Sequence, residues 1–81
     1  MIEEIKIILE KVKGIPGLSK QLADSADIIE DVELDSLEML EFMLEVESNL
    51  SIEINFEELD FSYLKSIEEL SKFLSEQKRV F

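Results

Sequence analysis

The sequence predicts an all-α fold: a small bundle of three main helices plus one short helix, with a long loop between the first two main helices. Three observations favour it. Apolar residues recur at helical spacing in separate segments, residues that cap or break helices mark the ends of these segments, and the one alternating segment, Ser51 to Asn55, is too short to build a sheet alone. A chain of 81 residues is expected to form one domain, residues 1–81, with a small core.

The first predicted helix covers residues 2–13. Its apolar residues follow the spacing of one helix face, and they are Ile2, Ile5, Ile8, Leu9 and Val12. Gly14 and Pro16 then end the helix. A long connection runs from Ile15 to about Leu34, and its length is typical of a functional loop. Its expected anchors on the core are Leu22, Ile28, Ile29 and Val32.

The second helix is expected to run from Asp35 or Ser36 to about Leu50, because strong helix formers fill this segment. An extended link over residues 51–55 and a short helical segment over residues 56–61 should follow. Ser66, with Glu69 three residues later, matches a capping box at the start of the last helix. The core face of that helix is expected to consist of Ile67, Leu70, Phe73 and Leu74. The tail, residues 77–81, should fray.

The charge balance is strongly acidic, with 20 acidic and eight basic residues and a net charge of −12. Such a surface repels nucleic acids and anionic lipids and attracts basic protein surfaces. Solubility alone is the simpler explanation of the acidity. The chain contains no apolar run of the length that spans a membrane and no basic segment ahead of an apolar one. We therefore expect a cytoplasmic monomer that binds neither nucleic acid nor membrane.

The chain contains no cysteine and no histidine. It therefore lacks a thiolate nucleophile, the commonest general base and the commonest zinc ligand. This inventory argues against a self-sufficient enzyme. No calcium-loop pattern fits residues 24–35, so no metal site is predicted, although loose divalent-ion binding at Glu30, Asp31 and Asp35 stays open.

The second helix carries two apolar stripes. At about 100° per residue, the first stripe suits the core of a small bundle, and it consists of Met39, Phe42, Met43, Val46 and Leu50. The second stripe, Leu37, Leu40 and Leu44, lies about 130° away. Glu38, Glu41 and Glu45 flank it on the side away from the core, and Glu47 lies between the two stripes. Either the long loop covers these leucines, or they form a partner-docking face with an acidic rim.

Asp35-Ser36-Leu37-Glu38 opens this helix. Asp or Ser at the N-cap with Glu in the first turn is ordinary helix-start chemistry, so the tetrapeptide alone is weak evidence for a functional site. However, a serine at a helix N-terminus lies beside free backbone N–H groups and the positive end of the helix dipole. This position suits an attached phosphodiester, and the preceding loop leaves the hydroxyl accessible.

Residues 30–37, Glu-Asp-Val-Glu-Leu-Asp-Ser-Leu, resemble the phosphopantetheine attachment site of acyl carrier proteins. That family usually reads acidic-Asp-Leu-Gly-x-Asp-Ser-Leu, followed by an acidic amphipathic helix, which here continues to Glu47. The order of helices and loops gives a weaker resemblance over the whole chain. Glu33 departs from the pattern, because it stands where the family usually has glycine.

The resemblance implies that a phosphopantetheinyl transferase moves 4′-phosphopantetheine from coenzyme A onto Ser36. The arm would then hold acyl or aminoacyl groups as thioesters and present them to enzymes of fatty-acid, polyketide or related biosynthesis. Asp35 and Leu37 would contact the transferase. Leu37, Leu40, Glu41, Leu44 and Glu47 match positions that the family presents to basic patches on partner enzymes. Glu38 and Glu45, from the acidic rim, complete the predicted recognition set.

A function of another class fits the same features. An acidic helical adaptor without a prosthetic group would bind one basic partner through the leucine stripe of the second helix. The mass of the protein recovered from cells distinguishes the two, because only the carrier gains one phosphopantetheine group.

Overall fold

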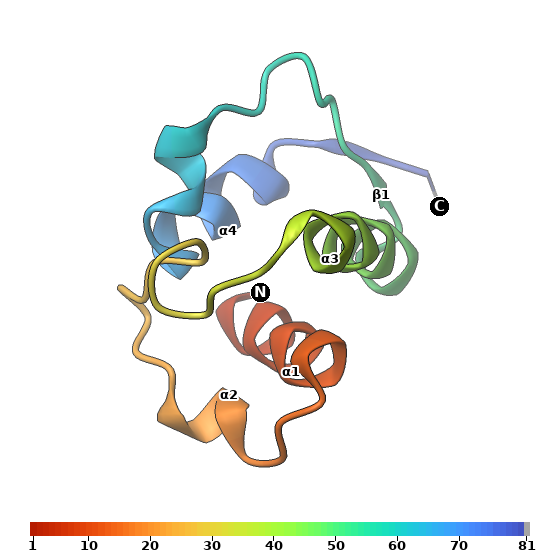
Figure 1. Cartoon of the computed structure of the whole chain (residues 1–81). Coiled ribbons are helices and arrows are strands. Elements are labelled where there is room, and N and C mark those ends of the chain that lie inside the picture. The colour runs from red at the N-terminus through yellow and green to blue at the C-terminus, as the bar shows by residue number, and fades with distance from the viewer. Residues whose placement is uncertain (81) are drawn as a thin grey trace.

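A computed structural model describes residues 1–80 and confirms the predicted all-α bundle (Figure 1). The three main helices are α1 (Ile2–Lys13), α3 (Ser36–Leu50) and α4 (Ile67–Ser75). Two short helices accompany them, namely α2 (Leu18–Gln21) and the 3₁₀ helix η1 (Phe61–Leu64). α1 and α3 lie against each other, and α4 packs on α1 and η1.

The main helices begin and end where local chemistry predicts. α1 ends at Gly14, which adopts φ 67° in the left-handed region that glycine tolerates best. α4 begins after Ser66, whose side chain accepts a hydrogen bond from the Glu69 amide at 3.0 Å. This bond confirms one half of the predicted capping box and satisfies an amide that has no partner within the helix.

The core lies between α1, α3, α4 and the long loop. Its largest fully buried side chains come from all four segments: Ile5, Leu9, Ile28, Phe42, Val46, Ile67, Leu70 and Leu74. Burying each such side chain contributes about 1.5–3 kcal/mol. The core faces predicted for α1 and α4 are therefore largely confirmed, with Ile2 and Val12 only half-buried at the edge.

Backbone hydrogen bonds attach the long loop to η1 and the start of α4. The Ile28 amide donates to the Leu64 carbonyl at 3.0 Å, and the Ile67 amide donates to the Ala26 carbonyl at 3.0 Å. Lys6, buried on α1, adds an ion pair with Asp24 at 2.7 Å, and this hydrogen bond raises the pKa of Lys6. These bonds hold residues 24–28 beside α4. This part of the loop therefore does not lie over the outer face of α3, which carries Leu37, Leu40 and Leu44.

The long connection between α1 and α3 is present and contains the four-residue helix α2. Two expectations outside the main helices were wrong. The short helix expected at residues 56–61 forms instead at residues 61–64. The tail is ordered as far as it is described, because β2 (Lys78–Arg79) pairs antiparallel with β1 (Ile52–Glu53). The Val80 amide also donates to the Ser51 carbonyl at 3.1 Å. Phe81, the last residue of the predicted tail, lies outside the described residues.

Candidate functional site

Ser36 is the first residue of α3 and is exposed. The preceding residue, Asp35, is the N-cap: its Oδ1 accepts from the Glu38 amide at 2.8 Å, and Glu38 Oε1 accepts from the Asp35 amide at 3.1 Å. This reciprocal pair is a complete capping box. Ordinary helix-start chemistry therefore accounts for Asp35 and Glu38 but not for Ser36, whose hydroxyl makes no hydrogen bond to any of residues 1–80.

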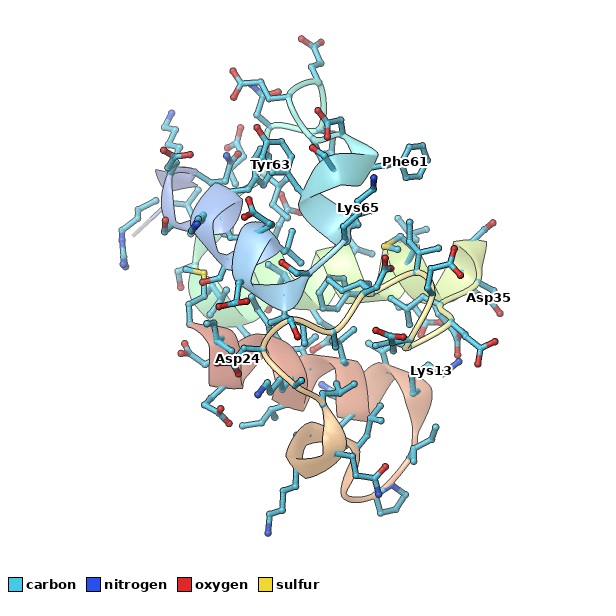
Figure 2. All side chains as sticks on the ribbon, turned by 90° about the vertical axis from the view of Figure 1, so that its left-hand side faces the viewer. Lys13, Asp24, Asp35, Phe61, Tyr63 and Lys65 are labelled. Atoms are coloured by element: carbon cyan, nitrogen blue, oxygen red, sulfur yellow. The ribbon has the colours of Figure 1, made fainter. Side chains whose placement is uncertain are left out.

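The turn before Ser36 is held by a residue that the sequence analysis missed. Lys13, in the last turn of α1, donates from Nζ to the Glu33 carbonyl at 3.2 Å and to Glu38 Oε1 at 3.1 Å. Figure 2 shows Lys13 directly beside the loop that leads to Asp35. Glu33 itself adopts φ 58°, in the left-handed region. The position where the carrier family usually has glycine thus has a backbone conformation that glycine favours.

The outer face of α3 is open to solvent. Leu37, Leu40 and Leu44 have exposed fractions of 64%, 56% and 56%. On the opposite face, Phe42 and Val46 are fully buried, and Met43 is nearly so. The two predicted apolar stripes are therefore real and distinct, and the alternative in which the long loop covers the leucines is wrong. Met39 and Leu50 lie at the boundary and are half-buried.

The acidic rim differs from the prediction, because three of its four glutamates are bonded within the protein. Glu38 pairs with Lys13 at 3.1 Å and Glu45 pairs with Lys11 at 2.9 Å, so both face α1. Glu47 accepts a hydrogen bond from the Ile54 amide at 2.9 Å. Glu41 is exposed and makes no ion pair within residues 1–80.

The Lys11–Glu45 contact also changes the acidity of Glu45. Hydrogen bonds from Lys11 and then from Asn49 lower the pKa of this carboxyl, because both stabilise its charged form. Glu45 is therefore a bound anion that joins α3 to α1. It offers a partner protein less negative field than a free carboxylate would, since Lys11 offsets its charge.

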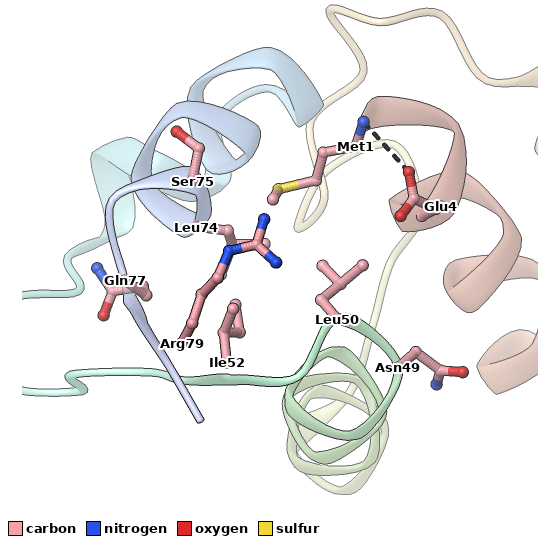
Figure 3. A pocket seen from close by; sticks show the side chains of 9 residues that line it. All are labelled: Met1, Glu4, Asn49, Leu50, Ile52, Leu74, Ser75, Gln77 and Arg79. Carbon is pink, nitrogen blue, oxygen red and sulfur yellow. Dashed lines mark ion pairs between the residues drawn. The ribbon is translucent and has the colours of Figure 1, made fainter. Parts of the chain in front are cut away.

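A cavity of about 220 Å³ lies at the other end of α3 (Figure 3). Its lining includes Leu50, Ile52 and Leu74, and Arg79 extends over it from β2. Since α3 has 15 residues, this cavity is about 20 Å along the helix from Ser36. It is therefore separate from the region around Asp35 and Ser36.

The structure also bears on two other expectations, which concern a metal site and a membrane-spanning helix. Within residues 1–80, no cluster of three or more acidic side chains has an arrangement that could hold a metal ion. Glu30, Asp31 and Asp35 are therefore not brought together into such a cluster. None of the helices in the described part of the chain is long and apolar enough to cross a membrane.

The surroundings of Ser36 fit a covalently attached phosphodiester. The hydroxyl is exposed, it is not used by the fold, and it lies at the positive end of a long helix. The Lys13 ammonium is held nearby by Glu38, in a protein whose net charge is otherwise strongly negative. The residues present can thus accept the group without disturbing the capping box.

Comparison with known proteins now identifies the family. Residues 3–74 match the family described as phosphopantetheine attachment site. A protein of Brachyspira hyodysenteriae (strain ATCC 49526 / WA1) named acyl carrier protein is 30% identical over 79 residues, which cover 98% of this chain and 97% of the relative. The chain belongs to the acyl carrier protein family. A second acyl carrier protein from the same species matches to the same extent, and no solved structure matches the chain significantly.

Membership of the acyl carrier protein family confirms three predictions. The protein is a carrier and not an enzyme, its prosthetic group is 4′-phosphopantetheine, and its partners include transferases and acyl-handling enzymes. Family membership also decides against the adaptor without a prosthetic group. Bound to the carrier, the arm supplies the reactive thiol, while the protein supplies the attachment point and the docking surfaces.

Proposed function

We propose that Ser36 is the attachment residue and that the 81 residues form a single acyl-carrier-type domain. The domain holds acyl or aminoacyl groups as thioesters on 4′-phosphopantetheine, for fatty-acid, polyketide or related biosynthesis. One observation carries the proposal: Ser36 is exposed at the start of α3 while Asp35 takes the capping role. The hydroxyl is therefore accessible and is not needed by the fold. A cytoplasmic monomer is the form we expect.

We assign recognition of the transferase and of later partners to the start and outer face of α3. Asp35 and Leu37 adjoin Ser36, while Leu40 and Leu44 extend the exposed apolar strip along the helix. Glu41 supplies the open negative charge beside this strip, and partners with basic patches suit it. Glu38, Glu45 and Glu47 take part mainly by fixing α3 in place, because each is bonded within the protein.

Two serine variants test the attachment residue. Ser36→Ala should lose no more than about 1 kcal/mol of stability, because Asp35 still caps α3. It should gain no mass when incubated with coenzyme A and a transferase, whereas the unchanged protein gains one phosphopantetheine group. Ser66→Ala is the matched control: it removes the cap of α4, so it should lose about 0.5–2 kcal/mol yet load normally. Loading of Ser36→Ala would show that another residue carries the arm.

A further inference from the structure

One side chain at the end of α1, that of Lys13, is bonded to the turn that precedes Ser36, which begins at Glu33. Lys13 donates to the Glu33 carbonyl at 3.2 Å and to Glu38 Oε1 at 3.1 Å. The same Glu38 oxygen accepts from the Asp35 amide at 3.1 Å. Lys13 therefore bonds to the residues on both sides of the Leu34-Asp35-Ser36 segment.

These bonds are better shielded than ordinary surface ion pairs. The side chains of Lys13 and Glu38 retain exposed fractions of 19% and 23%. Lys11, two residues earlier in the same turn of α1, pairs with Glu45 at a similar distance, but its own exposed fraction is 67%. Partial burial reduces screening by salt and water, so the bonds of Lys13 restrain the turn more strongly.

The turn needs such a restraint because of the residue at position 33. Glu33 has φ 58°, a conformation that is unfavourable for residues with a side chain and easy for glycine. If the bond from Lys13 were removed, Glu33 could relax to negative φ and displace Asp35 and Ser36. The bond thus compensates locally for the absence of glycine.

We infer that Lys13 is a positioning residue for loading: it holds the Glu33 turn and Glu38 so that Ser36 enters the transferase site in a fixed orientation. This inference rests on Ser36 being the attachment residue. Lys13 does not touch the reacting atoms and acts through Glu33 and Glu38. The exposed leucines of α3, which serve docking, are independent of it.

The inference makes a specific kinetic prediction for Lys13→Met in the full-length protein. Docking should persist, so KM for the carrier should stay close to its original value. The turnover number kcat for transfer from coenzyme A should fall about tenfold, because one net charge-assisted hydrogen bond corresponds to roughly this factor. Lys13→Arg, which can still donate to both acceptors, should recover most of the loss.

Lys11→Met is the matched control, because it removes the same charge from the same turn of α1 and also frees a glutamate of α3. It should leave kcat unchanged. Amide exchange of the protein without its arm gives a second readout: the Asp35 amide should exchange faster in Lys13→Met but not in Lys11→Met. Equal kinetic effects of the two variants, or unchanged exchange at Asp35, would overturn the inference.

A double variant tests whether Lys13 compensates for the backbone strain at Glu33. In a Glu33→Gly background, Lys13→Met should reduce kcat by only about two- to threefold, because glycine keeps the left-handed turn without help. An undiminished tenfold loss would refute compensation by Lys13. If instead the proposed function were wrong, the unchanged protein would not be loaded on Ser36 at all, and this result distinguishes the two failures.

Discussion

At the scale of single residues, Glu33 stands where the resemblance to acyl carrier proteins leads one to expect glycine, and its backbone angle gives a stability prediction. A left-handed conformation costs an L-residue about 1–2 kcal/mol, while glycine loses about 0.4–1 kcal/mol through its freer unfolded chain. Glu33→Gly should therefore stabilise the protein by up to about 1.6 kcal/mol, and each 1 kcal/mol should raise Tm by about 4–8 °C. Thermal unfolding followed by circular dichroism measures the change.

Glu30→Gly is the control for this prediction. Glu30 lies in the same loop and is exposed, and it is not among the residues with positive φ. The substitution makes the same chemical change and removes the same charge, yet it should lower stability by about 0.4–1 kcal/mol. If both variants shifted Tm in the same direction, relief of backbone strain would not be the cause.

The contribution of Glu45 to stability should depend on pH. The pKa of Glu45 is lowered by its hydrogen bonds to Lys11 and Asn49, so its native-state interactions favour the charged form. Its contribution to stability is therefore full above the ordinary glutamate pKa of 4.5 and is lost as pH falls through the lowered value. Glu45→Gln should be less stable than the unchanged protein at pH 7, and the difference should shrink steadily below pH about 4.5.

Paired urea titrations at several pH values measure this difference. Glu41→Gln is the control, because Glu41 lies on the same helix without an ion pair among residues 1–80. At pH 7, Glu41→Gln should show no comparable loss of stability, because it removes no ion pair within residues 1–80. A Glu45→Gln difference that stays constant down to pH 3 would mean that the carboxylate charge contributes nothing to stability.

At the scale of elements, α3 has one buried and one exposed apolar face. Phe42→Ala should cost about 3–5 kcal/mol, since Phe42 is fully buried. Leu40→Ala should cost less than about 1 kcal/mol, since Leu40 is more than half exposed. It should instead lower kcat/KM for loading by the transferase. Thermal melts and loading kinetics on both variants separate the two faces.

Leu70→Ala makes the same chemical change as Leu40→Ala, but at a buried position on another helix. Leu70 is fully buried on α4, so this variant should lose about 2–5 kcal/mol, a large part of the stability of so small a domain. Early melting of Leu40→Ala would contradict the exposure of the outer face. Normal melting with unchanged kcat/KM would place transferase docking elsewhere.

The sequence could predict these main helices because their signals are local. Periodicity and capping residues lie within each segment, as the Asp35 and Ser66 caps illustrate. η1 also has a local signal, the capping residue Asp60, whose side chain accepts from the Ser62 amide at 2.8 Å before the helix begins at Phe61. By contrast, the pairing of Ile52 with Arg79 joins distant segments and has no local signature.

The same distinction holds for the candidate site. Ser36 and the leucine face followed from one contiguous stretch of sequence. The partners of Glu38 and Glu45 did not, because Lys13 and Lys11 lie in α1 and meet α3 only through the tertiary fold. Helix geometry alone therefore predicted more unpaired glutamates on this rim than the described residues contain.

At the scale of the whole molecule, a net charge of −12 occupies a body of only 30 × 24 × 22 Å. At 0.01 M salt the screening length is about 30 Å, so all charges interact across the protein, whereas at 0.1 M it falls to about 10 Å. Excess negative charge destabilises the compact state by self-repulsion but accelerates encounter with a basic partner. Salt should therefore affect stability and association in opposite directions.

We expect Tm to rise between 0.01 and 0.3 M salt, while kcat/KM for the transferase falls over the same range. Differential scanning calorimetry and initial loading rates measure the two, with sodium and potassium chloride compared to exclude a specific ion effect. A Tm that decreased with salt would mean that attractive pairs such as Lys6–Asp24 outweigh the overall repulsion. A flat kcat/KM would remove electrostatic steering from the proposed function.

Two glutamine variants locate the steering charge. Glu41 is exposed on α3 and Glu68 is exposed on α4. Glu41→Gln and Glu68→Gln each remove one negative charge. Both should reduce the salt dependence of Tm slightly and about equally, because self-repulsion depends on total charge. Only Glu41→Gln should also flatten the salt dependence of kcat/KM, because a steering charge acts most strongly close to the docking surface. If Glu68→Gln flattened it equally, the net charge of the protein, and not the outer face of α3, would guide the encounter.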